Sequence, residues 1–161
     1  GRALLHNPHL IDLMRYYCGD AKRVESFAKY DDPENDLVVL SMIEFDSGAL
    51  GSIMYANTCG RYSEKLEIYG SKISALIDIE FNRLEVAEWA DQGYYKPSWK
   101  SLYSPSGYVP IHISRGYSAQ DRHFFDCIRN GETPLTSGED AYKTHVLMSD
   151  IYKKAGLPSL E

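Results

Sequence analysis

The sequence predicts an α+β domain with an open, mainly antiparallel sheet and helices packed on one face. Three observations carry this prediction: an amphipathic helical segment opens the chain, a series of strand-like segments joined by short turns follows, and two helical segments close it. The 161 residues are enough for one domain with a sizeable core. The sheet face that the helices do not cover is also expected to carry apolar side chains. This predicts a contact with another domain or another copy of the chain.

The first helix is predicted over residues 8–18. Asn7 is a favourable N-cap because its side-chain oxygen accepts an amide hydrogen of the first turn. Pro8 suits the next position because its φ is already near the helical value. The apolar spacing predicts a buried face formed by Leu10, Leu13, Met14 and Tyr17, and Gly19 ends the helix.

The strands are predicted by apolar runs that lie between turn residues. Six segments are expected, at residues 23–30, 37–45, 49–57, 64–69, 72–79 and 84–89. The run at 37–45 is nearly continuous, which is typical of a central strand covered on both faces. Asp46-Ser47-Gly48 and Gly70-Ser71 are predicted to be hairpin turns. Residues 91–116 are rich in Tyr, Ser, Pro and Gly, and we expect a long irregular flap or insertion there.

Two more helices are predicted at the end of the chain. Ser118-Ala119-Gln120-Asp121 resembles a capping box, so a helix is expected from there to Asn130-Gly131. Its inward-facing residues are predicted to be Phe124, Phe125 and Ile128. Ser137 opens the last helix in the same way. The apolar stripe of that helix continues to Gly156 and consists of Ala141, Met148, Ile151, Tyr152 and Ala155.

Composition and missing motifs exclude several classes of function. The net charge of −6 shows no basic footprint, so no nucleic-acid partner is expected. No apolar run approaches the ~20 residues of a membrane span. Three widely spaced cysteines without a CxxC pair argue against a disulfide framework or a zinc site and favour a reducing, cytoplasmic compartment. The chain has neither GxGxxG nor GxxxxGK[ST], so we expect no dinucleotide cradle in it, and GxSxG is also missing.

His9 is the main candidate for chemistry, because it lies in the first turn of the predicted first helix. The positive end of the helix dipole disfavours a charged imidazolium there, and a neutral ring could exchange a proton with a substrate hydroxyl. Asp12 lies on the same helix face and could orient the ring. A capped surface helix with an incidental histidine explains the same residues. A metal-binding face of His6, His9 and Asp12 is a weaker alternative, because His6 precedes the helix.

A second group of candidates lies near the end of the expected irregular stretch. His112 and Arg115, next to Tyr117, could contact an anionic or polyhydroxyl ligand, whereas a solvated loop is the alternative.

Four segments carry a resemblance to a known family. They are residues 1–16, which run from a leucine-rich start into HLIDLMRY, 45–53 (FDSGALGSI), 66–70 (LEIYG) and 117–140, with the pattern Y…F-x-x-C-I-x-x-G…P…S-x-E-D. Each match is degenerate alone, but together they span nearly the whole chain in order. They resemble the C-terminal domain of the Gfo/Idh/MocA family, the glucose–fructose oxidoreductase and inositol dehydrogenase group.

The resemblance implies that residues 1–161 are the substrate-binding and oligomerisation domain of an NAD(P)-dependent oxidoreductase for a sugar, cyclitol or related polyol. A Rossmann domain that precedes this chain would bind NAD or NADP, so this piece alone would bind no cofactor and would be inactive. The open sheet face would form a homo-oligomer.

In the same resemblance His9 corresponds to the family's catalytic histidine and Asp12 to the aspartate that follows it. We expect the substrate-binding residues to be His6, Asn7, His112, Arg115 and Tyr117. Leu5 stands four residues before His9, where family members often have Asp, Asn or His. The alternative is therefore a non-catalytic binding or dimerisation domain with the same fold. A stand-alone metal-assisted hydrolase or isomerase is a third, weaker possibility.

Overall fold

A computed structural model describes residues 8–32, 35–57, 59–60, 63–88 and 98–158 of the chain. These residues form helices and antiparallel strands, which confirms the predicted α+β class and the open, antiparallel sheet character. The strands belong to two sheets instead of one, and the chain divides into two compact units, Gly1–Gly60 with Leu135–Glu161, and Arg61–Pro134. No helix within the described ranges is long and apolar enough to cross a membrane.

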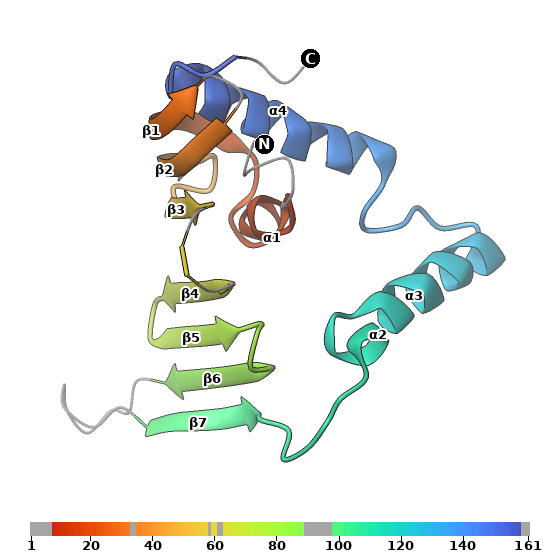
Figure 1. Cartoon of the computed structure of the whole chain (residues 1–161). Helices are drawn as coiled ribbons and strands as arrows, with labels where there is room; N and C mark the ends of the chain where they lie inside the picture. Colours follow the sequence, from red (N-terminus) through yellow and green to blue (C-terminus); the bar gives the residue numbers. More distant parts are fainter. Residues whose placement is uncertain (1–7, 33–34, 58, 61–62, 89–97, 159–161) are drawn as a thin grey trace. The chain divides into compact units, whose positions relative to one another are not determined.

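The first unit combines a three-stranded sheet with the first and last helices of the chain (Figure 1). Its elements are α1 (His9–Cys18), β1 (Ala21–Asp32), β2 (Asn35–Phe45), β3 (Leu50–Ala56) and α4 (Gly138–Lys154). The sheet order is β1-β2-β3, and both neighbouring pairs are antiparallel. The predicted turn between β2 and β3 is confirmed: Gly48 has a φ of 85°, and its amide donates to the Phe45 carbonyl oxygen at 2.9 Å.

The core of this unit lies between one face of the sheet and the two helices. It is made of apolar side chains from all five elements and from the end of the chain: Ile11, Met14, Val24, Val39, Ile43, Phe45, Ile53, Leu147, Met148, Ile151, Tyr152 and Leu157. Along β2, Val39 and Ile43 are buried, whereas Leu40 and Met42 are 44% and 64% exposed. The expectation that this strand is covered on both faces is therefore wrong for this chain. An apolar run shows that both faces of a strand could be buried, but it does not show whether other parts of the same chain pack against both faces.

Helix α1 begins one residue later than predicted, and its buried face agrees with the prediction only in part: Met14 is buried and Leu10 packs against the core. Pro8 occupies the N-cap position without a side-chain capping bond, and Asn7 lies outside the described residues. The buried residues are Ile11, Met14 and Arg15, whereas Tyr17 is 56% exposed. Gly51 of β3 allows a close approach, because a Cβ there would lie 2.5 Å from Met14 Cε.

The second unit is a four-stranded antiparallel meander with two helices. Its elements are β4 (Lys65–Gly70), β5 (Ile73–Asp78), β6 (Arg83–Glu88), β7 (Ser98–Tyr103), α2 (Ile111–Ser114) and α3 (Tyr117–Asn130). Strand β7 and helix α2 both fall in the stretch expected to be irregular, so that prediction is wrong for these two segments. β7 pairs with β6 through backbone hydrogen bonds, and such pairing does not require an alternation of apolar and polar residues.

Two helix ends agree with the sequence prediction and one differs. Ser137 caps α4 as predicted, and its Oγ accepts from the Asp140 amide at 3.2 Å. Gly131, with a φ of 68°, ends α3 as predicted. The capping box at Ser118 is not formed, because α3 begins at Tyr117 after a left-handed Gly116.

The predicted inward face of α3 is also wrong. Phe124, Phe125 and Ile128 are 50%, 56% and 62% exposed, whereas Cys127 is 2% exposed. The helix packs against the short α2, which covers little of it.

Candidate functional site

His9 is the first residue of α1, and its side chain is exposed. The amide groups of a first helical turn have no partners within the helix, so this end presents donors and an accessible imidazole together. His9 therefore has the exposure that a proton-exchanging group needs. His6 and Asn7, its predicted neighbours in the site, lie outside the described residues.

Asp12, one turn further along α1, is bonded to α4. Its Oδ1 accepts a hydrogen bond from Thr144 Oγ1 at 2.6 Å and lies 3.6 Å from Arg15 Nη1. The carboxylate is therefore held at the interface between the two helices. Its predicted role in orienting the His9 ring stays a prediction.

Arg15 is a functional candidate that the sequence analysis missed. Its side chain is only 5% exposed and donates to four acceptors. These are the Asp140 carbonyl oxygen at 3.0 Å, Asp140 Oδ1 at 2.9 Å, Asp20 Oδ1 at 3.0 Å and Thr144 Oγ1 at 2.7 Å. A signal was present, because Arg15 follows Asp12 at helical i,i+3 spacing beside the apolar stripe. Spacing alone, however, does not show that a charged residue is buried.

The charges in this network influence one another. Burial lowers the pKa of Arg15, but hydrogen bonds and charges from Asp20 and Asp140 outweigh it and raise that pKa above its ordinary value. A hydrogen bond from Lys143, whose Nζ lies 2.7 Å from Oδ2, and a second one from Arg15 lower the pKa of Asp20. Both shifts favour the charged forms of Arg15 and Asp20.

The remaining candidates belong to the second unit. His112 is exposed on α2, and Tyr117 is 53% exposed at the first residue of α3. Arg115, just after α2, forms an ion pair with Glu64, with 3.4 Å between Nη1 and Oε2. His112, Arg115 and Tyr117 lie close together in sequence around the end of α2, and the structure adds a contact from Arg115 to Glu64, the first residue of a predicted strand.

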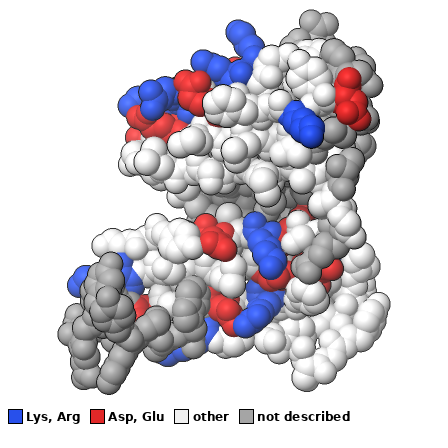
Figure 2. Space-filling model, turned by 60° about the vertical axis from the view of Figure 1, so that its left-hand side comes forward, with Lys and Arg blue, Asp and Glu red and all other residues white. Residues whose placement is uncertain are grey.

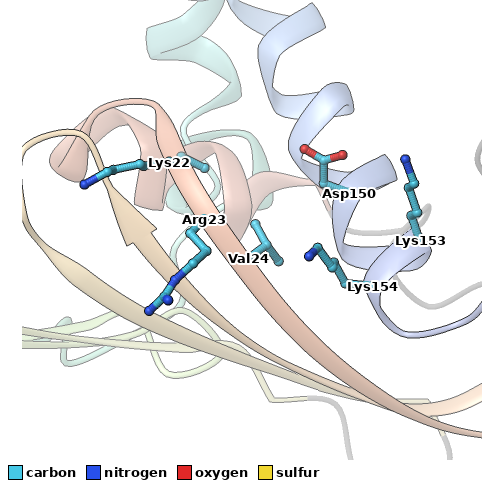
Figure 3. Close-up of a pocket in the computed structure, with 7 residues that line it drawn as sticks. Lys22, Arg23, Val24, Asp150, Lys153 and Lys154 are labelled. Carbon is cyan, nitrogen blue, oxygen red and sulfur yellow. The ribbon is translucent and has the colours of Figure 1, made fainter.

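A shallow pocket in the first unit is lined by charged side chains of β1 and α4, among them Lys22, Arg23, Asp150 and Lys154 (Figure 3). In this view Lys22 and Arg23 point away from α4. Both are paired with Glu44, at 3.0 Å and 3.4 Å. The face in Figure 2 likewise shows basic and acidic side chains side by side. The pocket is therefore not a convergent anion site.

The described residues do not fit a metal ion or a dinucleotide. Within the described ranges, no three His, Cys, Asp or Glu side chains are grouped as metal ligands. The paired strands are all antiparallel, and in the described part of the chain no glycine-rich turn joins a strand to a helix in the manner of a pyrophosphate site.

Comparison with known proteins identifies the fold. Residues 2–76 match the family model described as the GFO/IDH/MocA C-terminal domain. Levoglucosan dehydrogenase in complex with NADH and levoglucosan is 22% identical, with a TM-score of 0.79, over 92% of this chain and 46% of that chain. An NAD binding oxidoreductase from Klebsiella pneumoniae is 20% identical, with a TM-score of 0.78, over 92% of this chain and 46% of that one.

A third structure, UDP-N-acetylglucosamine 3-dehydrogenase GnnA from Acidithiobacillus ferrooxidans, is 10% identical, with a TM-score of 0.75, over 91% of this chain and 45% of that chain. No curated protein sequence matches the chain. The chain spans about half the length of the solved structures that it resembles. Over residues 2–76 the chain thus resembles the C-terminal domain of the Gfo/Idh/MocA family, and it shares its fold with these solved structures.

Proposed function

We propose that this chain is the substrate-binding and oligomerisation half of an NAD(P)-dependent oxidoreductase that acts on a sugar, cyclitol or related polyol. The observation that carries the proposal is the fold shared with levoglucosan dehydrogenase, whose structure is a complex with NADH and levoglucosan. GnnA, a dehydrogenase of a nucleotide sugar by its name, shares the same fold. The three widely spaced cysteines without a CxxC pair support a reducing, cytoplasmic location.

The dinucleotide belongs to another part of the complete protein in this proposal. The described strands are antiparallel and do not form the parallel strand–turn–helix unit of a dinucleotide site, which supports binding of NAD or NADP by a separate Rossmann domain. In this proposal the chain binds the polyol and exchanges the proton of its reacting hydroxyl.

His9 is the proposed catalytic residue. Its exposed imidazole would accept the proton of the hydroxyl at the reacting carbon and return it in the reverse reaction. Asp12, held by Thr144, would keep the turn that carries His9 in place. The proposed substrate contacts are His6, Asn7, His112, Arg115 and Tyr117, because imidazole, amide, guanidinium and phenol groups all form hydrogen bonds with hydroxyls.

The test is His9→Ala in the complete protein. Loss of a general acid–base group should lower kcat by the ~10²–10⁴-fold typical of such catalysis. Cofactor affinity should stay the same, because the dinucleotide is held elsewhere. His145→Ala is the matched control, since His145 is an exposed histidine on α4, and it should keep the wild-type kcat.

A His9→Ala variant with the wild-type kcat would overturn the catalytic assignment. The chain would then be a non-catalytic binding or dimerisation domain, the alternative raised by Leu5 at the position four residues before His9.

A further inference from the structure

We infer that Thr144 and Arg15 are positioning residues for His9: together they fix to α4 the turns of α1 that set where His9 lies. This inference rests on the proposed function, because it takes His9 to be the proton-exchanging group. It assigns a role to residues more than 120 positions apart in the sequence.

Thr144 is the link between the two helices. It is 3% exposed, and its Oγ1 accepts from Arg15 Nη1 at 2.7 Å and donates to Asp12 Oδ1 at 2.6 Å. A hydroxyl has one proton to give, so both bonds together fix its orientation. One side chain of α4 therefore holds two successive turns of α1.

Arg15 extends the same connection in two directions. It reaches Asp140 in the first turn of α4 and Asp20 in the segment that follows α1. A buried guanidinium without these acceptors would be costly, so a position of α1 in which they are reached is favoured. In this inference the network selects one arrangement of α1 on α4.

Apolar packing alone would not define the position of α1 so closely. Ile11 and Met14 share a core cluster with Met148 and Ile151, and contacts of this kind are not directional. A small slide or rotation of α1 would keep most of that contact, whereas it would break hydrogen bonds that need defined distances and angles.

The position of His9 follows from the turn held by Asp12. His9 is the first residue of α1 and lies three residues before Asp12, and Pro8 has no side-chain capping bond. The Asp12 amide donates to the Pro8 carbonyl oxygen at 2.9 Å and closes the turn that contains His9. A proton-exchanging group displaced by about 1 Å can lose on the order of 10²-fold in rate.

The experiment compares Thr144→Val with Ile151→Val in the complete protein. Thr144→Val keeps the side-chain shape and removes both hydrogen bonds, and we expect kcat to fall by about 10- to 100-fold with an unchanged KM for the cofactor. Ile151→Val trims a fully buried side chain of the same helix without touching the network, and it should keep kcat. Thermal unfolding of both variants shows whether each is folded during the assay. Thr144→Ser retains the hydroxyl and should keep the wild-type kcat.

A double-mutant cycle separates positioning from a general loss of structure. In the His9→Ala background Thr144→Val should lower kcat no further, because both changes remove the same contribution. Equal kcat losses with and without His9 overturn the inference, as does a wild-type kcat in Thr144→Val alone. If His9→Ala itself leaves kcat unchanged, the proposed function fails, and the positioning role fails with it.

If Thr144→Val does not fold, Arg15→Lys takes its place in the same cycle. Lysine keeps the charge but lacks the planar fork that reaches several acceptors at once. A wild-type kcat in Arg15→Lys would then overturn the inference.

Discussion

Arg15 is a charged residue on the buried face of α1. The apolar spacing of α1 predicted that Leu10, Leu13, Met14 and Tyr17 would face inward. Met14 is buried and Leu10 packs against the core, but Tyr17 is exposed and Arg15 is buried. Four hydrogen bonds donated by its guanidinium compensate for the lost hydration. A charged side chain with enough acceptors can thus be buried beside an apolar stripe.

Asp20 gives this network a measurable pH dependence. Hydrogen bonds from Lys143 and Arg15 lower the pKa of Asp20. A depressed pKa means that the contribution to stability is complete above the ordinary carboxyl pKa and is lost as the pH falls through the folded-state pKa. Asp20→Asn should therefore lower the free energy of unfolding near neutral pH, and its difference from the wild type should shrink in acid.

Urea unfolding between about pH 7 and about pH 3 measures this difference. Asp126→Asn, on the surface of α3, serves as the control and should show a smaller effect. A difference between Asp20→Asn and the wild type that stays constant across this range would contradict the interpretation.

At the scale of elements, α3 and α4 show that the same capping pattern has different outcomes. Ser137 and Ser118 each precede a carboxylate by three residues, but only Ser137 accepts a hydrogen bond from the helix. The left-handed Gly116 starts α3 earlier, so Ser118 falls inside the helix. The position of a helix start depends on the backbone conformation before it, which side-chain identity reflects only in part.

Ser137→Ala should therefore lower the free energy of unfolding by about 1 kcal/mol, the usual cost of a lost N-cap. Ser118→Ala is the matched control and should change it by less than about 0.5 kcal/mol. Both values come from chemical denaturation of the same protein. Equal losses in the two variants would show that the Ser137 bond does not stabilise α4.

At the scale of the whole molecule, the outer face of the first sheet remains exposed. Phe27, Leu40 and Met54 lie directly opposite one another on β1, β2 and β3, and Met42 is close to them. Their exposed fractions range from 44% to 71%. A contiguous apolar patch of this kind marks an interface, which supports the proposed homo-oligomer.

Leu40→Asp should weaken this association, because it places a charge at the centre of the patch. Sedimentation velocity of the complete protein at micromolar concentration should show a dimer or larger species for the wild type and a smaller species for the variant. Leu102→Asp, at an exposed leucine of β7 in the second unit, is the control and should sediment like the wild type. If the wild type is monomeric, we would instead expect the patch to pack against another part of the complete protein.

The sequence by itself determined most local features of this protein. The positions of α1, of six of the seven strands in the described residues, of the turn at Gly48, of the C-terminal end of α3 and of α4 all follow from short-range preferences that operate over a few residues. The family likeness was also readable from short motifs, and so was His9 as a candidate at a helix start.

Only the tertiary structure decided which faces are covered and what holds the candidate site together. β7 forms by pairing with a neighbouring strand, and Thr144 and Asp140 reach Arg15 from 129 and 125 positions away. Such contacts depend on where distant segments meet, and periodicity within one segment contains no information about its partner. For the same reason, burial of Arg15 and exposure of Phe124 could be seen only once the elements were packed.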